Sequence, residues 1–566
     1  MSARNIIPFF LIVCLAAGTY CFADEESERS QIQQWVEQLG HESFLVRQRA
    51  ESLLIRAGIH AYPELQRAKQ SYDIEVVRRA GYVLSQIEQS FLDMENRVAA
   101  CDWILPYMRN PNPAYRARMI WVLADPNLDL AKGEGLQALC RLLRFEENSV
   151  LRLEAAKSLI ASPPFSPLMR QKWYQYIRDT SQNTGDDELL TCVADYAKLW
   201  CGLDDAAEKN TQQTTPELRE QVRHVGAATL RLLERKENRI QIGSKIDILL
   251  HYAVAELQDT VGLIEDRDKT VSLALAIEPG PIQTSEPLEP IGQGDGLLMN
   301  EHYHTGRYLK QRYRLHWAIA HFQKVMESGD ISLRIESGKL AAESAIYLAD
   351  YALAIRFFDK HIEMLKGADH VRNDTESAIV LAQRRQAYCF AEQAAAAENW
   401  EEVQKTIVQA WATDPPGTRD ISDISGDIDL LLVAHRLCKH FPGITSEFKD
   451  TMDRQLRKSW NNVVADYDGS TFDSQIKRVI ACNFAAWLLA NTDGDYQAAL
   501  TLVEAALKVE PDDLAILDTL AHVYFLGGKV DEAIRIQEQV VRFAPEAVVF
   551  QRTLERFKRK KADGER

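Results

Sequence analysis

The sequence lacks the short motifs that usually mark an active site. Its 566 residues contain no GxSxG, no GxxxxGK(S/T), no GxGxxG and no CxxCH pattern. His41 and Glu42 begin an HExxH pattern, but Leu45 stands where the second histidine is needed. These absences predict a chain without a catalytic, cofactor-binding or metal site.

Two other kinds of segment match metal sites only in part. Glu301 and His304 are three residues apart and would share one helix face, but no second ExxH segment accompanies them. The aspartates in residues 420–429 and 466–469 lack the glycine position and the distal glutamate of a calcium loop. We expect polar helix surface and solvated loops at these places.

Cysteine is scarce and shows no pairing pattern. Nine cysteines are present, and seven of them lie beyond residue 23. These seven are Cys101, Cys140, Cys192, Cys201, Cys389, Cys438 and Cys482. The number is odd and no pair has CxxC spacing, so neither a disulfide framework nor a zinc site is indicated. Cys192 and Cys201 are the only close pair, and the sequence leaves open whether they are bridged.

Positive charge is also in short supply. Lys and Arg number 66 against 82 Asp and Glu, which gives a net charge of −16. The negative electrostatic potential of such a chain repels phosphate groups. The sequence therefore argues against binding to nucleic acid and allows at most peripheral contact with a membrane. The exception is the tail at residues 551–566, which holds four consecutive cations from Lys558 to Lys561 and is expected to cap the last repeat. The alternative is that it contacts an anionic partner, such as lipid headgroups or the acidic flank of another copy of the chain.

Long hydrophobic runs are absent beyond the N-terminus. Ile6 to Ala17 form an apolar segment behind Arg4, and Ala23 is a small residue suited to cleavage. A run of about a dozen apolar residues is too short to span a hydrocarbon core comfortably. We expect residues 1–23 to be a signal peptide and the chain to be exported to the periplasm or cell envelope. Retention of this segment as an anchor is the alternative.

Alternating strand patterns are nearly absent, and apolar residues recur at helical spacing, which predicts an all-α fold. Near the C-terminus, GDYQAAL from Gly494 and GKVDEAI from Gly528 occupy the same place in two units. The prolines that close these units, Pro511 and Pro545, are 34 residues apart. These residues resemble the tetratricopeptide repeat over residues 476–550. The resemblance implies helical hairpins stacked into an α-solenoid.

Looser versions of the same hairpin occupy residues 298–420. Ala354 and Val403 stand at the position of the close-contact alanine in the better units, and Gly306 supplies a small residue in a weaker one. Residues 421–475 break the spacing of the array and are expected to form an irregular insert.

The N-terminal part of the chain repeats in a different way. Apolar–arginine pairs precede four apolar helix faces, at Arg47, Arg78, Arg116 and Arg152. The pattern resembles HEAT repeats over residues 24–165. The resemblance implies helical hairpins in which these arginines pair with acidic residues of a neighbouring repeat.

The middle of the chain connects the HEAT-like array to the array that resembles tetratricopeptide repeats. Residues 166–276 show helical spacing without a clear period. Residues 277–297 are rich in proline and glycine and cannot continue a helix. We expect this second segment to be a linker between the two arrays.

In tetratricopeptide arrays the first helix of each hairpin lines a concave groove. Carried onto this chain by register, the resemblance predicts a partner-binding groove of ten residues: Lys339, Glu343, Arg385, Tyr388, Glu392, Phe484, Leu488, Asp518, His522 and Phe525. The family's Lys/Asn/Arg set for clamping a C-terminal carboxylate is missing. Phe484 and Leu488 have a second interpretation, in which they pack against a neighbouring helix.

The whole pattern resembles that of large bacterial envelope proteins of poorly defined role. We therefore expect a non-catalytic scaffold without a cofactor that binds envelope or periplasmic proteins. A self-associating structural component, forming homo-oligomers, is the alternative. A third interpretation is a solenoid enzyme that cleaves glycans, with Glu343 before Ser344, but the Gly-Leu-Met segment of such enzymes here precedes the glutamate instead of following it.

Overall fold

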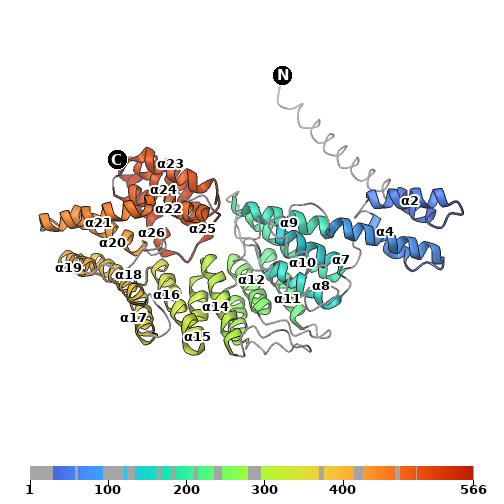
Figure 1. Cartoon of the computed structure of the whole chain (residues 1–566), viewed down its shortest axis with the longest axis horizontal. Coiled ribbons are helices and arrows are strands. Elements are labelled where there is room, and N and C mark those ends of the chain that lie inside the picture. Colours follow the sequence, from blue (N-terminus) through green and yellow to red (C-terminus); the bar gives the residue numbers. More distant parts are fainter. Residues whose placement is uncertain are drawn as a thin grey trace, which may run out of the picture. The chain divides into compact units, whose positions relative to one another are not determined.

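A computed structural model gives the fold of most of the chain (Figure 1). The described residues are 30–57, 61–92, 120, 123, 134–146, 148–161, 163, 167–181, 187–208, 215–234, 245–277, 295–368, 375–412, 425–465, 472–492 and 494–564. Every element in these ranges is a helix and no strand occurs in them, which confirms the all-α prediction. The predicted signal peptide, Arg116 and most of the predicted linker lie outside the described residues.

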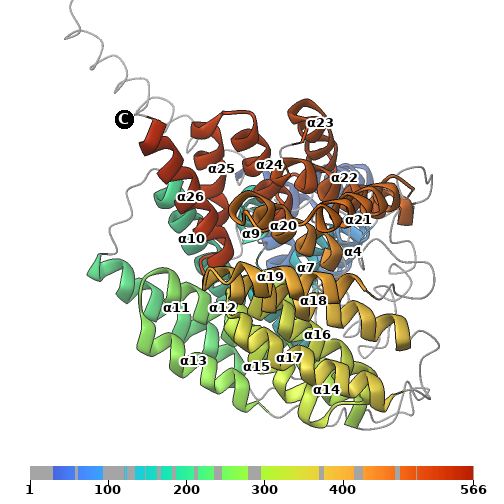
Figure 2. The same cartoon turned by 90° about the vertical axis from the view of Figure 1, so that its left-hand side faces the viewer.

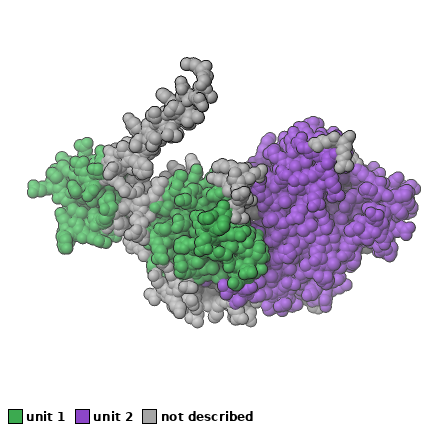
Figure 3. Space-filling model, turned by 180° about the vertical axis from the view of Figure 1, so that it is seen from behind, with its two compact units in different colours: residues 1–242, 249–270 green, residues 243–248, 271–566 purple. Residues whose placement is uncertain are grey.

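The chain divides into two compact units, coloured separately in Figure 3. Unit 1 comprises residues 1–242 and 249–270, and unit 2 comprises residues 243–248 and 271–566. The chain thus passes from one unit to the other ahead of the predicted linker at residues 277–297.

Unit 1 is built of helical hairpins. Its helices are α2 (Phe44–Ala57), α3 (Tyr62–Ala68), α4 (Ile74–Leu92), α7 (Glu134–Phe145), α8 (Ser149–Ala161), α9 (Pro167–Ser181), α10 (Glu188–Glu208) and α11 (Pro216–Glu234). Helices α12 (Lys245–Thr260) and α13 (Ile264–Ala276) contain the boundary between the units. Leu39, Leu54, Leu65 and Val83 are completely buried and form the core of the N-terminal hairpins.

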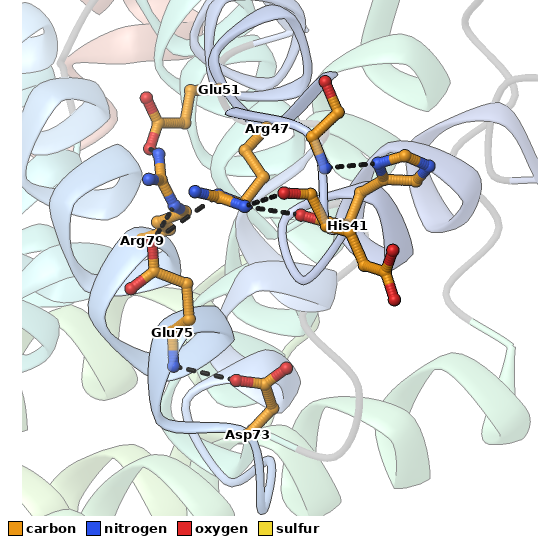
Figure 4. Close-up of polar contacts among 8 residues, drawn as sticks. His41, Arg47, Glu51, Asp73, Glu75 and Arg79 are labelled. Carbon is orange, nitrogen blue, oxygen red and sulfur yellow. Dashed lines mark hydrogen bonds and ion pairs between the residues drawn. The ribbon is translucent and has the colours of Figure 1, made fainter. Parts of the chain in front are cut away.

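Arginine–carboxylate pairs link successive segments of unit 1, as Figure 4 shows for its N-terminal end. Nε of Arg47 lies 3.6 Å from the Glu75 carboxylate. Arg79 pairs with Glu75 at 2.7 Å and with Glu51 at 2.5 Å, which joins α4 to α2. Further along, Arg152 forms an ion pair with Asp187.

The predicted pairing of the repeated arginines with acidic residues of a neighbouring segment therefore holds for Arg47 and Arg152. Arg78 is exposed instead, and the adjacent Arg79 makes the contacts. The HEAT-like assignment of residues 24–165 stays a prediction.

The two close cysteines of unit 1 are free thiols. Cys192 and Cys201 both lie on α10, and nine residues of α-helix place them on opposite faces about 13 Å apart along the axis. A disulfide requires Cα atoms within about 7 Å, so the bridge that the sequence left open does not form in this fold.

Unit 2 consists of successive hairpins in which a first and a second helix pack antiparallel (Figure 2). The first helices are α14 (Asp295–Gln311), α16 (Ile331–Tyr347), α18 (Thr375–Ala396), α20 (Ser425–His440), α22 (Phe472–Asn491) and α24 (Leu514–Leu526). Their partners are α15 (Leu315–Ser328), α17 (Tyr351–Gly367), α19 (Trp400–Trp411), α21 (Ser446–Ala465), α23 (Tyr496–Leu507) and α25 (Val530–Phe543). A last helix, α26 (Val548–Gly564), packs against α25.

Small residues allow the two helices of each hairpin to approach closely. Ala354, Ala499 and Ala533 are completely buried at the positions where the repeat pattern predicts an alanine, and so is Val403 in its hairpin. A Cβ atom on Gly306 would lie 2.6 Å from the ring of Phe322, so only glycine fits there.

Within the described residues, four hairpin turns of unit 2 each use one left-handed residue. Gly528 has φ of +74°, and the equivalent turns hold Tyr313, Ala349 and Glu398 at φ between 53° and 55°. Side chains other than glycine are strained in this region. The second helix then begins at an Asp or Asn in several hairpins; Asp350, for example, accepts a hydrogen bond from the amide of Leu353.

The segment predicted to be an irregular insert, residues 421–475, contains helices α20 and α21. Ile428, Leu431 and Phe448 of this hairpin are at most 3% exposed and belong to the same core as Leu488 of α22. The aspartates and glycines near the ends of the segment concealed an apolar helical face within it. The array therefore continues through this region as a further hairpin.

Candidate partner-binding face

Most first helices of unit 2 contact the next first helix along the chain, and the ion pair between Glu343 and Arg385 joins α16 to α18. Helix α14 contacts α16, α18 contacts α20, and α22 contacts both α20 and α24. We call the surface that these first helices share the inner face. All ten residues predicted to line the groove lie on first helices, as the repeat register requires.

A chain of opposite charges crosses the inner face from α14 to α20. The Glu343 carboxylate lies 3.0 Å from Nζ of Lys310 and 3.2 Å from the guanidinium of Arg385. Burial acts to raise the pKa of Glu343, but the charges of Lys310 and Arg385 outweigh it and lower the pKa to about 2. A carboxylate so firmly ionised cannot donate a proton near neutral pH, which argues against Glu343 as the general acid of a glycan-cleaving enzyme.

Asp429 of α20 extends this chain of charges and was not anticipated from the sequence. Burial raises its pKa to about 6; the positive charge of Arg385 opposes this shift, and the negative charges of Glu392 and Glu343 add to it. Asp429 lies in the segment that was interpreted as an irregular insert. Once α20 is known to be a first helix, its register identifies Asp429 as a residue of the inner face.

Tyr388 and Glu392 form a second group with residues of α17 and α20. The Glu392 carboxylate pairs with the guanidinium of Arg436 at 2.5 Å. The rings of Tyr351 and Tyr388 meet edge to face, with centroids 6.0 Å apart. Burial raises the pKa of Tyr351 to about 12, although the charges of Arg552 and Arg436 act in the opposite direction. Both tyrosines therefore present neutral hydroxyl groups at this face.

Asp518, His522 and Phe525 of α24 contact the last two helices instead of an open groove. Nε2 of Gln537 donates a hydrogen bond to Asp518 at 2.7 Å. The ring of Phe525 stacks on Phe557 of α26, with centroids 4.4 Å apart. Burial raises the pKa of Asp518 to about 7, against the effects of the hydrogen bond from Gln537 and the charge of Arg556.

Phe484 and Leu488 lie in the hydrophobic core between α18, α20 and α22. Leu488 is 1% exposed, and Phe484 packs, partly buried, against the same core. Their position matches the second interpretation, packing against a neighbouring helix. Lys339, by contrast, has a side chain that is 39% exposed, so it is accessible to a partner.

The C-terminal helix returns to the first hairpins of unit 2, a contact that the sequence did not indicate. Phe550 of α26 packs against Tyr313 and Tyr347, with ring centroids 5.5 Å and 5.7 Å away. Before α26, the Glu546 carboxylate lies 2.9 Å from Nδ1 of His316 and accepts a hydrogen bond from its backbone amide at 3.1 Å. Helix α26 also contacts α16. The array of unit 2 therefore closes on itself, and α26 forms part of the inner face.

The part of the chain that the structure describes holds no group of three or more side chains suited to a metal ion. The predicted polar pair Glu301 and His304 lies on α14. Beside it, the Nδ1 atoms of His302 and His321 are 2.7 Å apart in the interior. Burial, helped by the charge of Lys324, lowers the pKa of His302 to about 4, so this pair is neutral at neutral pH.

One protein family matches part of the chain. Residues 490–552, from the end of α22 to the start of α26, match the tetratricopeptide repeat family. Among solved structures, the tetratricopeptide repeat domain of P58(IPK) is 15% identical; the match covers 66% of this chain and all of that one, with a TM-score of 0.15. No curated protein matches the chain.

The fold and the repeats together define a class of protein. The chain is an all-α solenoid that contains tetratricopeptide repeats. Solenoids of this class generally bind other proteins and are generally not enzymes. None of the described helices is both long and apolar enough to cross a membrane.

Proposed function

We propose that this chain is an exported, non-catalytic scaffold that binds envelope or periplasmic proteins on the inner face of unit 2. The observation that carries the proposal is the inner face itself. Solenoids use such extended surfaces to bind partners. Here the surface presents charged and aromatic side chains from at least five helices, including Lys339, Arg436 and Tyr388.

Export is proposed from the sequence of the first 23 residues. Arg4 and the apolar segment that follows it have the order of a signal peptide, and Ala23 offers a cleavage position. Mass spectrometry of the mature N-terminus after expression with the natural leader tests this part. An N-terminus at Asp24 is expected, and a mature chain that still begins at Met1 and remains in the cytoplasm would contradict export.

Crosslinking mass spectrometry in the native cell fraction tests the binding role. We expect one reproducible foreign protein to crosslink to the first helices of unit 2. Lys339→Glu should reduce these crosslinks, because Lys339 is an exposed cation on the inner face. Lys360→Glu is the matched control, since Lys360 is exposed on the second helix α17.

Two outcomes would contradict the scaffold proposal. Crosslinks that form only between copies of this chain would favour the self-associating component. Crosslinks to a foreign protein that Lys360→Glu weakens and Lys339→Glu does not would move the binding site to the second helices.

A further inference from the structure

Two cations of α26 have no carboxylate partner among the described residues. Arg552 and Arg556 are exposed and four residues apart, which places them on one side of the helix with a separation of about 6 Å along its axis. Among the residues that the structure describes, neither forms an ion pair with a carboxylate. Arg556 instead lies over the rings of Phe557 and Phe525, at 5.2 Å and 5.5 Å from their centroids.

A third cation, Arg436 of α20, acts electrostatically on the same region. Arg436 and Arg552 both act electrostatically on Tyr351, and the charge of Arg436 also acts on Arg556. The hydroxyl groups of Tyr351 and Tyr388 lie in the same region. Arg436 and the two arginines of α26 therefore belong to one electrostatic neighbourhood, together with the neutral hydroxyl groups of Tyr351 and Tyr388.

The contact between Arg556 and His522 leaves the arginine available to a ligand. Nδ1 of His522 lies 3.1 Å from the Arg556 guanidinium and 2.7 Å from Oδ1 of Asn491. A guanidinium only donates hydrogen bonds, and Nδ1 carries either one proton or one lone pair. His522 can therefore satisfy only one of the two neighbours at a time. If Arg556 turns to a ligand, His522 donates to Asn491 and the interior loses no hydrogen bond.

The nearby carboxylates that the structure describes leave Arg552 and Arg556 without an ion pair. Glu343 already lies between Lys310 and Arg385, and Glu392 pairs with Arg436 alone. Asp518, whose charge acts on Arg556, has a pKa of about 7 and is therefore only partly ionised at neutral pH. Among the described residues, Arg552 and Arg556 are therefore unpaired cations in a chain that as a whole carries a net charge of −16.

We propose that Arg552 and Arg556, next to Arg436, bind an acidic segment of the partner protein, and that α26 adds this site to the inner face by closing the array. The inference rests on the proposed scaffold function and names the chemistry of the partner. Guanidinium groups pair with carboxylates through two parallel hydrogen bonds, which favours arginine for this recognition. Alternate residues of an extended peptide are about 7 Å apart on one side, close to the spacing of Arg552 and Arg556.

Fluorescence anisotropy with fluorescein-labelled octaglutamate tests the proposal on the full chain. We expect the doubly substituted protein Arg552→Gln/Arg556→Gln to bind this peptide at least about tenfold more weakly than the unsubstituted protein. The matched control, Arg535→Gln/Arg542→Gln, removes the same charge from exposed positions of α25 and should bind within about twofold of it. Circular dichroism checks that both proteins fold. Arg552→Gln alone provides a milder substitution, because Arg552 is exposed.

Several outcomes would overturn the proposal. One is equal binding by the site-substituted protein and the control. Another is that octaglutamate does not bind although a foreign protein still crosslinks to the inner face. That result would contradict the acidic segment and leave the proposed scaffold function standing. A third is displacement of the peptide by inorganic phosphate as readily as by unlabelled octaglutamate, which would mark a site for small anions. Failure of the scaffold function itself would appear separately, as the absence of inner-face crosslinks to a foreign protein.

Discussion

At the scale of the residue, carboxyl groups on the inner face have pKa values shifted in opposite directions. Glu343 lies between two cations and has a pKa of about 2, whereas Asp429 and Asp518 have pKa values of about 6 and 7 because burial dominates. A lowered pKa favours folding at neutral pH, and a raised pKa opposes it. The charge of Glu343 is therefore stabilising, and those of Asp429 and Asp518 are costly.

We predict that Glu343→Gln lowers the free energy of unfolding by about 3 kcal/mol at pH 7, because the pKa in the folded chain is about 2 against an ordinary value of 4.5. The contribution of this charge is present above pH 4.5 and is lost as the pH falls toward 2. The difference between the two proteins should therefore shrink over that range. Urea unfolding followed by circular dichroism at several pH values measures it.

Glu336→Gln is the control for this prediction. Glu336 lies on the same helix, is 39% exposed and is 4.0 Å from Lys339, so its removal should cost at most about 1 kcal/mol. A pH-independent difference for Glu343→Gln, or equal effects of the two substitutions, would contradict the role assigned to the Glu343 charge.

A second prediction concerns the strained turn residue Glu398, which has φ of +55° and an exposed side chain. Glu398→Gly should raise the free energy of unfolding by about 0.5–1 kcal/mol, because glycine adopts this conformation without the steric cost that other residues have. Glu363→Gly, at an exposed position within α17, should instead lower it by about 1 kcal/mol. Opposite signs in urea unfolding are expected, and a loss of stability in both proteins would argue against strain at Glu398.

At the scale of the element, α26 is more than a solvated cap. Lys558 and Lys561 pair with Glu538 and Asp531 of α25, as expected for a basic capping helix. Its first turn, however, reaches the hairpins at the other end of the array, where Phe550 packs against both Tyr313 and Tyr347. The helix therefore both covers the last repeat and closes the array.

We predict that Phe550→Ala lowers the free energy of unfolding of unit 2 by about 3 kcal/mol, because a side chain that is 4% exposed loses its contacts with two aromatic rings. Val549→Ala is the neighbouring control; its side chain is only half-buried, and a loss of about 1 kcal/mol or less is expected. Chemical denaturation measures both. Equal effects of the two substitutions would show that closure by Phe550 contributes little.

The elements predicted best from the sequence were hairpins whose helix contacts depend on residues close together in the chain. Ala499 and Ala533 identify the hairpins around them, because the contact between two adjacent helices depends on residues near each other in the sequence. The turns at Ala349 and Glu398 lack the expected glycine, and the aspartate-rich ends of the segment around α20 hid its apolar face. Asp429 and Arg436 were missed for that reason.

The contact of α26 with α16 could not be predicted from the sequence at all. Each hairpin contributes a small rotation to the array, and only their sum decides whether Phe550 meets Tyr347. No pattern in the sequence encodes that sum. In the sequence, Arg552 and Arg556 are recognisable only as members of a basic tail. Their position relative to Arg436 depends on how α26 packs against the first hairpins of unit 2.

At the scale of the whole molecule, the division into two compact units leads to a fourth prediction. Each unit has its own core, so we expect calorimetry of the full chain to show two transitions. A fragment of residues 263–566, which begins ahead of α13, should fold alone and unfold at one of those temperatures. A single transition in the full chain, together with an unfolded fragment, would show that the units depend on each other for stability.

Hydrogen exchange of the full chain, alone and with the partner found by crosslinking, tests the central claim most directly. If the inner face is the binding site, the added protection should fall on the first helices α16, α18 and α20 and on the first half of α26. Protection confined to second helices such as α19 and α23, or to unit 1, would contradict it.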